Sequence, residues 1–271
     1  MVELSRHALA VGRSVMLLAA GSRRALVRAL TLVLVAAAPA AGQTNGQFWG
    51  TFTWTWLKSS RLTYDLELEP KVLVSAPEGE PGWASLEVVP NVQFAARRWL
   101  DLVGEMATAT TKQTDDVSSF ELAPRVGFRL HMTTRELPVG PLMREEIPGR
   151  RLVLRNLLRV EFRNLFYSDD RDDDSVVRLR NRLELQVPLN RARVNEDGAY
   201  YLLTDWEWFV PLDDPTERFA NRQRIRTGLG YRRNVQWRFE ALYIWTRSRD
   251  TTDQGFTTSD NIVNLRVKRV F

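Results

Sequence analysis

Apolar and charged residues alternate over long stretches of this chain of 271 residues, and few folds accommodate such a pattern. In residues 60–74, Leu62, Tyr64, Leu66 and Leu68 occupy even positions, whereas the odd positions carry Arg, Thr, Asp, Glu and Lys. Successive side chains of a β-strand point to opposite faces of the sheet. The pattern therefore predicts β-strands with one lipid-like face and one ionic face.

The same rhythm, less regular in places, predicts eleven strands. They are residues 47–57, 60–74, 83–94, 98–109, 118–132, 151–166, 176–187, 199–210, 219–231, 235–247 and 259–271. Between them lie tight turns at 58–60, 97–98 and 232–234, and longer loops rich in Asp, Gly and Pro at 75–82, 169–174, 211–215 and 250–255. Short and long connections in alternation are typical of a transmembrane β-barrel. We therefore predict an all-β fold, a single antiparallel up-and-down transmembrane barrel.

The strand count conflicts with a rule of such barrels. Single-chain bacterial barrels have even strand numbers, so we expect ten or twelve strands rather than eleven. Either residues 47–57 do not form a wall strand, or a further strand lies within residues 133–150, whose three prolines give that segment no clear assignment.

The chain ends in a strand-like segment whose last residue is Phe271. Val263, Leu265, Val267 and Phe271 share one face, which Arg269 interrupts. The segment resembles the terminal strand by which bacterial outer-membrane barrels are recognised for insertion. We therefore expect the outer-membrane lipid and the barrel-assembly machinery as partners.

The first 42 residues have the composition of an export signal. Five arginines precede an apolar run at 30–38, and small residues at 40–42 offer a cleavage site. The apolar run is far shorter than the roughly 20 residues of a spanning helix. We predict a signal peptide at 1–42, cleaved near 40–43, a barrel domain at 43–271, and Met16 as an alternative start. The expected location is the outer membrane of a Gram-negative bacterium, with the periplasm as the alternative.

Charge and cysteine content exclude several classes of protein. The chain has 38 Lys and Arg and 33 Asp and Glu, but removing 1–42 leaves 33 basic and 32 acidic residues. A nearly neutral domain gives no support for nucleic-acid binding, which requires a basic patch. Without cysteine there is no disulfide framework and no thiolate metal site.

The polar faces of two consecutive strands, 151–166 and 176–187, carry most of the charge that we expect inside the barrel. The predicted lumen-facing cluster, completed by later strands, is Arg155, Arg159, Glu161, Arg163, Arg178, Arg180, Arg182, Glu184, Glu207 and Glu240. Buried charges must be paired or hydrated, so the cluster either seals the barrel with ion pairs or lines a narrow pore that favours anions. A third possibility is a soluble, lipocalin-like periplasmic barrel, whose apolar faces would point inward.

Candidate catalytic and metal-binding residues are sparse. After signal cleavage only His131 remains as a histidine, and no nucleophile is tied to it by spacing. The acidic run from Asp169 to Asp174 does not match the EF-hand calcium loop and is typical of a solvated loop. We therefore expect no enzymatic activity, cofactor or metal.

Several short motifs resemble one bacterial family. They are Gly46-Gln47-Phe48-Trp49, the strand from Arg178 to Gln186, the segment from Tyr200 to Glu207, and Asn221-Arg222 followed by Gly228-Leu229-Gly230-Tyr231. With them, residues 46–271 look like the DUF2490 family. The resemblance implies an outer-membrane barrel of uncharacterised role and transfers no catalytic residue.

Overall fold

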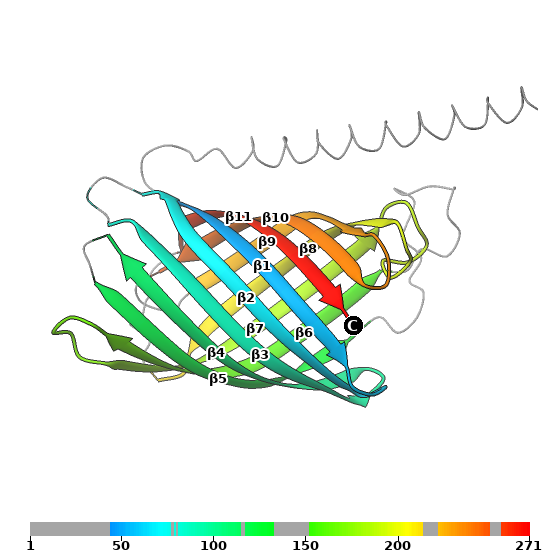
Figure 1. Ribbon diagram of the computed structural model, residues 1–271, viewed down its shortest axis with the longest axis horizontal. Coiled ribbons are helices and arrows are strands. Elements are labelled where there is room, and N and C mark those ends of the chain that lie inside the picture. The colour runs from blue at the N-terminus through cyan, green and yellow to red at the C-terminus, as the bar shows by residue number, and fades with distance from the viewer. Residues whose placement is uncertain are drawn as a thin grey trace, which may run out of the picture. The chain divides into compact units, whose positions relative to one another are not determined.

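The computed structural model describes residues 44–76, 79, 81–114, 117–132, 152–213, 222–249 and 256–271. The predicted signal peptide and its cleavage site lie outside these residues. Eleven strands form one closed barrel (Figure 1). They are β1 (Asn45–Leu57), β2 (Leu62–Ser75), β3 (Trp83–Arg97), β4 (Leu100–Gln113), β5 (Ser118–His131), β6 (Val153–Tyr167), β7 (Asp174–Pro188), β8 (Ala199–Pro211), β9 (Arg222–Arg232), β10 (Trp237–Ser248) and β11 (Thr257–Val270). The all-β barrel prediction is confirmed.

The barrel has eleven strands, so the expectation of ten or twelve is wrong. Consecutive strands pair antiparallel, whereas β1 and β11 pair parallel, with Phe48 opposite Val263 and Thr55 opposite Val270. In an odd-numbered ring of alternating strands, the first and last run in the same direction, and a parallel pair is what closes it. The ring includes β1 as a wall strand, and β5 pairs directly with β6. The described strands therefore close the ring without a strand from residues 133–150, which lie outside the described residues.

Strand β1 runs from one end of the barrel, the Asn45 end, to the other, the Leu57 end. Tight turns at 58–61, 98–99 and 233–236 lie at the Leu57 end, where β11 also finishes. The predicted alternation of short and long connections holds only in part. The connection at 114–117, at the Asn45 end, is also short, and the one at 189–198, at the Leu57 end, is longer.

Side chains of opposite character occupy the two faces of the wall. On β6, the outward Phe162 is 44% exposed, whereas the inward Arg159 is 6% and Glu161 is 0% exposed. The exposed large hydrophobic residues of the other strands, including Phe52, Val92 and Leu265, repeat the pattern. The barrel is therefore apolar outside and charged inside. Within the described ranges, no helix has the length and apolarity needed to cross a membrane.

A small apolar cluster interrupts the charged interior near the Leu57 end. Val194, from the connection between β7 and β8, packs with Tyr201, Leu203 and Leu242. Gly230 on β9 makes room for the ring of Tyr201, because a Cβ at this position would overlap that ring. The Tyr201 hydroxyl donates a hydrogen bond to Glu240 at 2.5 Å.

This packing leads to a first expected result. Gly230→Val should lower the free energy of unfolding by about 1–3 kcal/mol, because an overpacked interior forces side chains and backbone to shift. Urea unfolding followed by tryptophan fluorescence measures the change. Gly104→Val is the matched control, since a Cβ at Gly104 meets no atom within 4 Å. Equal losses for both variants would contradict the packing role of Gly230.

Candidate functional site

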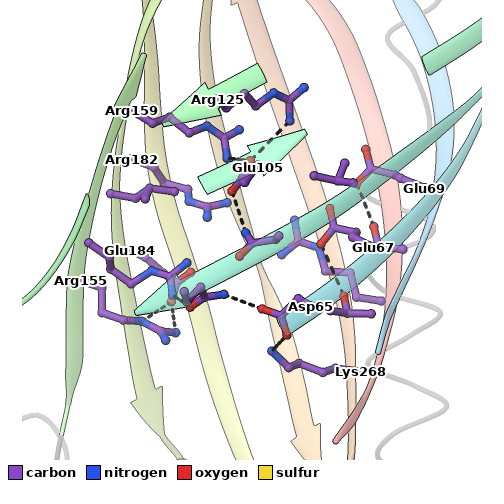
Figure 2. Close-up of a pocket in the computed structure, with 18 of the residues that line it drawn as sticks. Asp65, Glu67, Glu69, Glu105, Arg125, Arg155, Arg159, Arg182, Glu184 and Lys268 are labelled. Atoms are coloured by element: carbon purple, nitrogen blue, oxygen red, sulfur yellow. Dashed lines mark hydrogen bonds and ion pairs between the residues drawn. The ribbon is translucent and has the colours of Figure 1, made fainter. Parts of the chain in front are cut away.

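The barrel encloses a cavity with a volume of about 630 Å³ (Figure 2). Its lining extends from Leu57 and Val270, at one end of their strands, to Trp49 and Lys71, near the other end of theirs. Most lining side chains are charged or polar, because inward positions of ten strands, all except β8, contribute Arg, Lys, Asp, Glu, Asn, Gln, His or Thr to the lining. The volume lies in the range of small-molecule sites, about 300–1,000 Å³.

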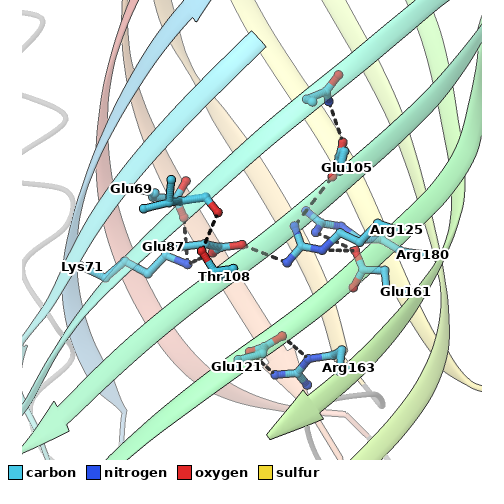
Figure 3. Close-up of polar contacts among 12 residues, drawn as sticks. Glu69, Lys71, Glu87, Glu105, Thr108, Glu121, Arg125, Glu161, Arg163 and Arg180 are labelled. Atoms are coloured by element: carbon cyan, nitrogen blue, oxygen red, sulfur yellow. Dashed lines mark hydrogen bonds and ion pairs between the residues drawn. The ribbon is translucent and has the colours of Figure 1, made fainter. Parts of the chain in front are cut away.

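Glu161 on β6 is the centre of an ion-pair network in the wall of this cavity. Its carboxylate accepts hydrogen bonds from Arg159 Nε at 2.8 Å, Arg178 Nε at 2.6 Å and Arg180 Nη1 at 3.2 Å. Arg125 Nε lies 3.7 Å from the same group. Figure 3 shows Arg125 and Arg180 converging on Glu161. A fully buried carboxylate is tolerable only with such compensation.

A second buried carboxylate, Glu207 on β8, extends the network to β9. Arg180 Nε donates to it at 2.5 Å, and Arg226 Nη2 and Arg224 Nη1 lie at 3.4 and 3.8 Å. Arg226 also donates to Asp205 at 2.7 Å. Arg180 therefore joins the two carboxylate centres.

On the other side, arginines reach past a neighbouring strand to carboxylates of β3 and β4. Arg125 of β5 donates to Glu87 of β3 at 2.9 Å, and Arg159 of β6 donates to Glu105 of β4 at 2.6 Å. Lys71 binds Glu87 at 2.5 Å and lies 2.9 Å from Glu69 (Figure 3). The two arginine contacts cross the curved inner surface, whereas those of Lys71 stay within β2 and the adjacent strand β3.

The structure places all ten residues of the predicted lumen-facing cluster inside the barrel. Glu161 and Glu207 are fully buried in ion pairs, and the other eight line the cavity. Arg155 pairs with Glu184, and Arg163 with Glu121 at 2.7 Å. The cluster is thus divided among several ion-paired groups within a larger charged interior.

Sequence reasoning left several interior residues out of the cluster. They are Glu87, Glu105, Glu121, Arg125, Arg224 and Arg226. Each occupies one of the alternate positions that point inward on its strand. The inward residues next to them, Val89, Val103, Ala107 and Gly228, are apolar or small and interrupt the polar pattern. The six charged residues can be identified from the sequence if every second position of a strand is assigned inward, even where that position is apolar or small.

His131 and the acidic loop differ in their surroundings. His131 Nε2 lies 2.7 Å from Asp101 Oδ2 at the rim of the cavity, and no hydroxyl contact to the imidazole occurs among the described residues. In the loop at 168–173, Arg171 donates to Asp169 at 2.8 Å. The described portion of the chain contains no group of three or more His, Cys, Asp or Glu residues arranged to hold a metal ion.

The terminal segment closes the wall. Phe271 N–H donates to Thr55 O at 2.9 Å, and its ring stacks on Trp56 with centroids 5.7 Å apart. The Arg269 guanidinium lies 4.5 Å from the centroid of the Phe271 ring. On the predicted apolar face, Leu265 is 39% exposed, and Val263 and Val267 share its parity.

A family model described as a protein of unknown function, DUF2490, matches residues 142–257. The resemblance inferred from the motifs is confirmed over this segment, which contains β6 to β10 and hence most of the arginines of the lumen. The motif at 46–49 lies outside the match. No curated protein matches the chain.

Proposed function

We propose that this protein is an integral β-barrel of the bacterial outer membrane, whose charged lumen gives small polar solutes a passive route. The observation that carries the proposal is the inverted polarity of the wall. A water-soluble protein buries its apolar side chains, whereas this barrel buries Glu161 and Glu207 and exposes Phe52 and Phe162. A lipid environment accounts for that arrangement.

The dimensions of the wall support membrane insertion. The shortest strand has 11 residues and the longest have 15, and about 9–11 tilted residues suffice to cross a bilayer. Outward aromatic residues lie near both ends of the strands, with Trp56 and Trp237 at one end and Phe48 and Phe166 at the other. Aromatic girdles of this kind are enriched at membrane interfaces.

The polarity of the cavity argues against a lipocalin-like ligand site. An apolar ligand requires an apolar lining, but arginines and carboxylates dominate this one. The cavity also supports passage of solutes over a lumen that ion pairs close completely. The ion-paired side chains lie against the inner surface of the barrel and still leave about 630 Å³ of space. Hydration of that space by polar side chains is favourable.

Two measurements on the full chain test the proposal. The protein should remain with the outer-membrane fraction through a carbonate wash, and the purified barrel should allow passage of a small neutral solute such as glycerol into proteoliposomes. Release by carbonate contradicts membrane integration. Retention without solute passage means that the ion pairs seal the lumen, which contradicts the route.

The lipid-facing wall yields a further expected result. Leu183→Arg should lower the free energy of unfolding from vesicles by about 2–4 kcal/mol, the cost of arginine near the bilayer midplane. Leu183 lies in the middle of β7 and pairs in register with the outward Trp206. Leu212→Arg serves as the control, because Leu212 lies just beyond β8 and is 55% exposed. Urea titration in vesicles measures both variants, and equal costs would contradict the assigned lipid face.

A further inference from the structure

Two groups of charged residues of opposite sign line different parts of the cavity, and further cations on β5, β6, β10 and β11 lie between them. Strands β2 to β4 contribute six carboxylates and one lysine, and β7 and β9 contribute six arginines and one carboxylate. The acidic wall consists of Asp65, Glu67, Glu69, Glu87, Asp101 and Glu105, and the basic wall of Arg178, Arg180, Arg182, Arg222, Arg224 and Arg226.

The strand order places these walls on opposite sides of the lumen. In the eleven-membered ring, β8 and β9 are each five strands from β3, counted in one or the other direction. Figure 2 shows Glu67 and Glu69 on one side of the cavity and Arg159 and Arg182 on the other. A cavity between walls of opposite charge has an electric field across it, and low-dielectric surroundings strengthen such a field.

Three charged residues that line the cavity have no direct counter-charge: Glu67 in the acidic wall, Arg182 in the basic wall, and Arg129 on β5 between them. Among the described residues, Glu67 has no cation within 4 Å, and its carboxylate accepts a long hydrogen bond of 3.5 Å from Thr53 Oγ1. Arg182 likewise has no carboxylate within 4 Å in the described part of the chain. Arg129 donates to the Gln93 amide oxygen at 2.6 Å and has no carboxylate so close among the residues that the structure describes. Such groups are satisfied by water or by a ligand.

From this separation we propose that the cavity accommodates small zwitterionic solutes, whose cationic group lies toward Glu67 and whose anionic group lies toward Arg182 and Arg129. The inference rests on the proposed route and names its class of solute. A simple anion is attracted by the basic wall but repelled by the acidic one, and a simple cation has the reverse problem. A zwitterion satisfies both walls in one orientation.

Equilibrium tracer exchange across proteoliposomes tests the inference without net movement of charge. At neutral pH, labelled alanine, lactate and ethylammonium represent a zwitterion, an anion and a cation of similar size. We expect alanine to exchange on the order of tenfold faster than either ion, the lower range of electrostatic focusing. Glu67→Gln should bring the exchange rate of lactate close to that of alanine. Arg182→Gln should do the same for the exchange rate of ethylammonium.

Two exposed residues outside the cavity provide matched controls. Asp170→Asn and Arg98→Gln remove the same kinds of charge from turns and should leave the ratios unchanged. Exchange of all three solutes at equal rates, or fastest exchange of lactate, overturns the inference and leaves the proposed route intact.

A sealed lumen gives a separate result. No exchange of any solute, glycerol included, refutes the proposed route. Calorimetric titration of the detergent-solubilised barrel with alanine and with lactate then decides the inference. Preferential binding of alanine that is lost in Glu67→Gln supports the zwitterion site, and absence of that preference overturns it.

Discussion

Replacing Glu161 by Gln is expected to lower the free energy of unfolding by about 3–5 kcal/mol, because removal of one partner leaves buried charges uncompensated. Glu161 is 0% exposed and accepts hydrogen bonds from Arg159, Arg178 and Arg180. The amide retains the size of the carboxylate and loses its charge. Urea unfolding in vesicles, followed by tryptophan fluorescence, measures the loss.

Two comparisons separate charge from packing. Asp169→Asn removes a carboxylate from an exposed pair with Arg171 and should cost at most about 1 kcal/mol. Adding Arg178→Gln to Glu161→Gln should recover part of the loss, because it removes one of the stranded cations. If the losses of the two single variants simply add up in the double variant, the two residues are not directly coupled, and the expected result is contradicted.

The strands were predictable because each wall position has one of two environments. Apolar and charged side chains alternate over residues 158–163 of β6, and apolar and polar ones over 177–187 of β7 except at Asn181, so parity alone assigns Leu158 outward and Arg159 inward. The same reasoning predicted eleven segments, and the described residues form eleven strands at nearly those bounds. The error arose from a rule about even strand numbers, since strand patterning carries no information on whether the closing pair is parallel.

The partners within the lumen were less predictable. Parity shows that Arg125 and Glu87 point inward, but their ion pair joins β5 to β3 across the intervening β4. Such a contact depends on the curvature of the wall and on the length of the arginine side chain. The opposition of the acidic and basic walls depends in turn on the number of strands in the ring. Both properties emerge only when the sheet closes.

Removing β11 together with Phe271 (residues 257–271) is expected to abolish assembly of the barrel, and deleting Phe271 alone should reduce the folded yield severalfold. The last strand pairs with both β10 and β1, so its loss exposes two strand edges, and each unsatisfied backbone group in lipid costs several kcal/mol. Phe271 closes the final step of that pairing through its hydrogen bond to Thr55 O and its stacking on Trp56.

The reduction caused by the Phe271 deletion should be visible in the amount of heat-modifiable protein in the outer-membrane fraction. Phe271→Tyr keeps the backbone hydrogen bond and an aromatic ring for stacking, and should retain most of the yield, whereas Phe271→Ala loses the stacking, worth about 0.5–1.5 kcal/mol. Val235→Ala, at a 63% exposed position in the turn between β9 and β10, controls for a general effect of changes at this end. Unchanged folded yield after deletion of Phe271 would show that β1 and β11 close the barrel without their terminal contact. The two strands would then depend on the register from Asn45 to Thr55 alone, which already supplies the parallel ladder.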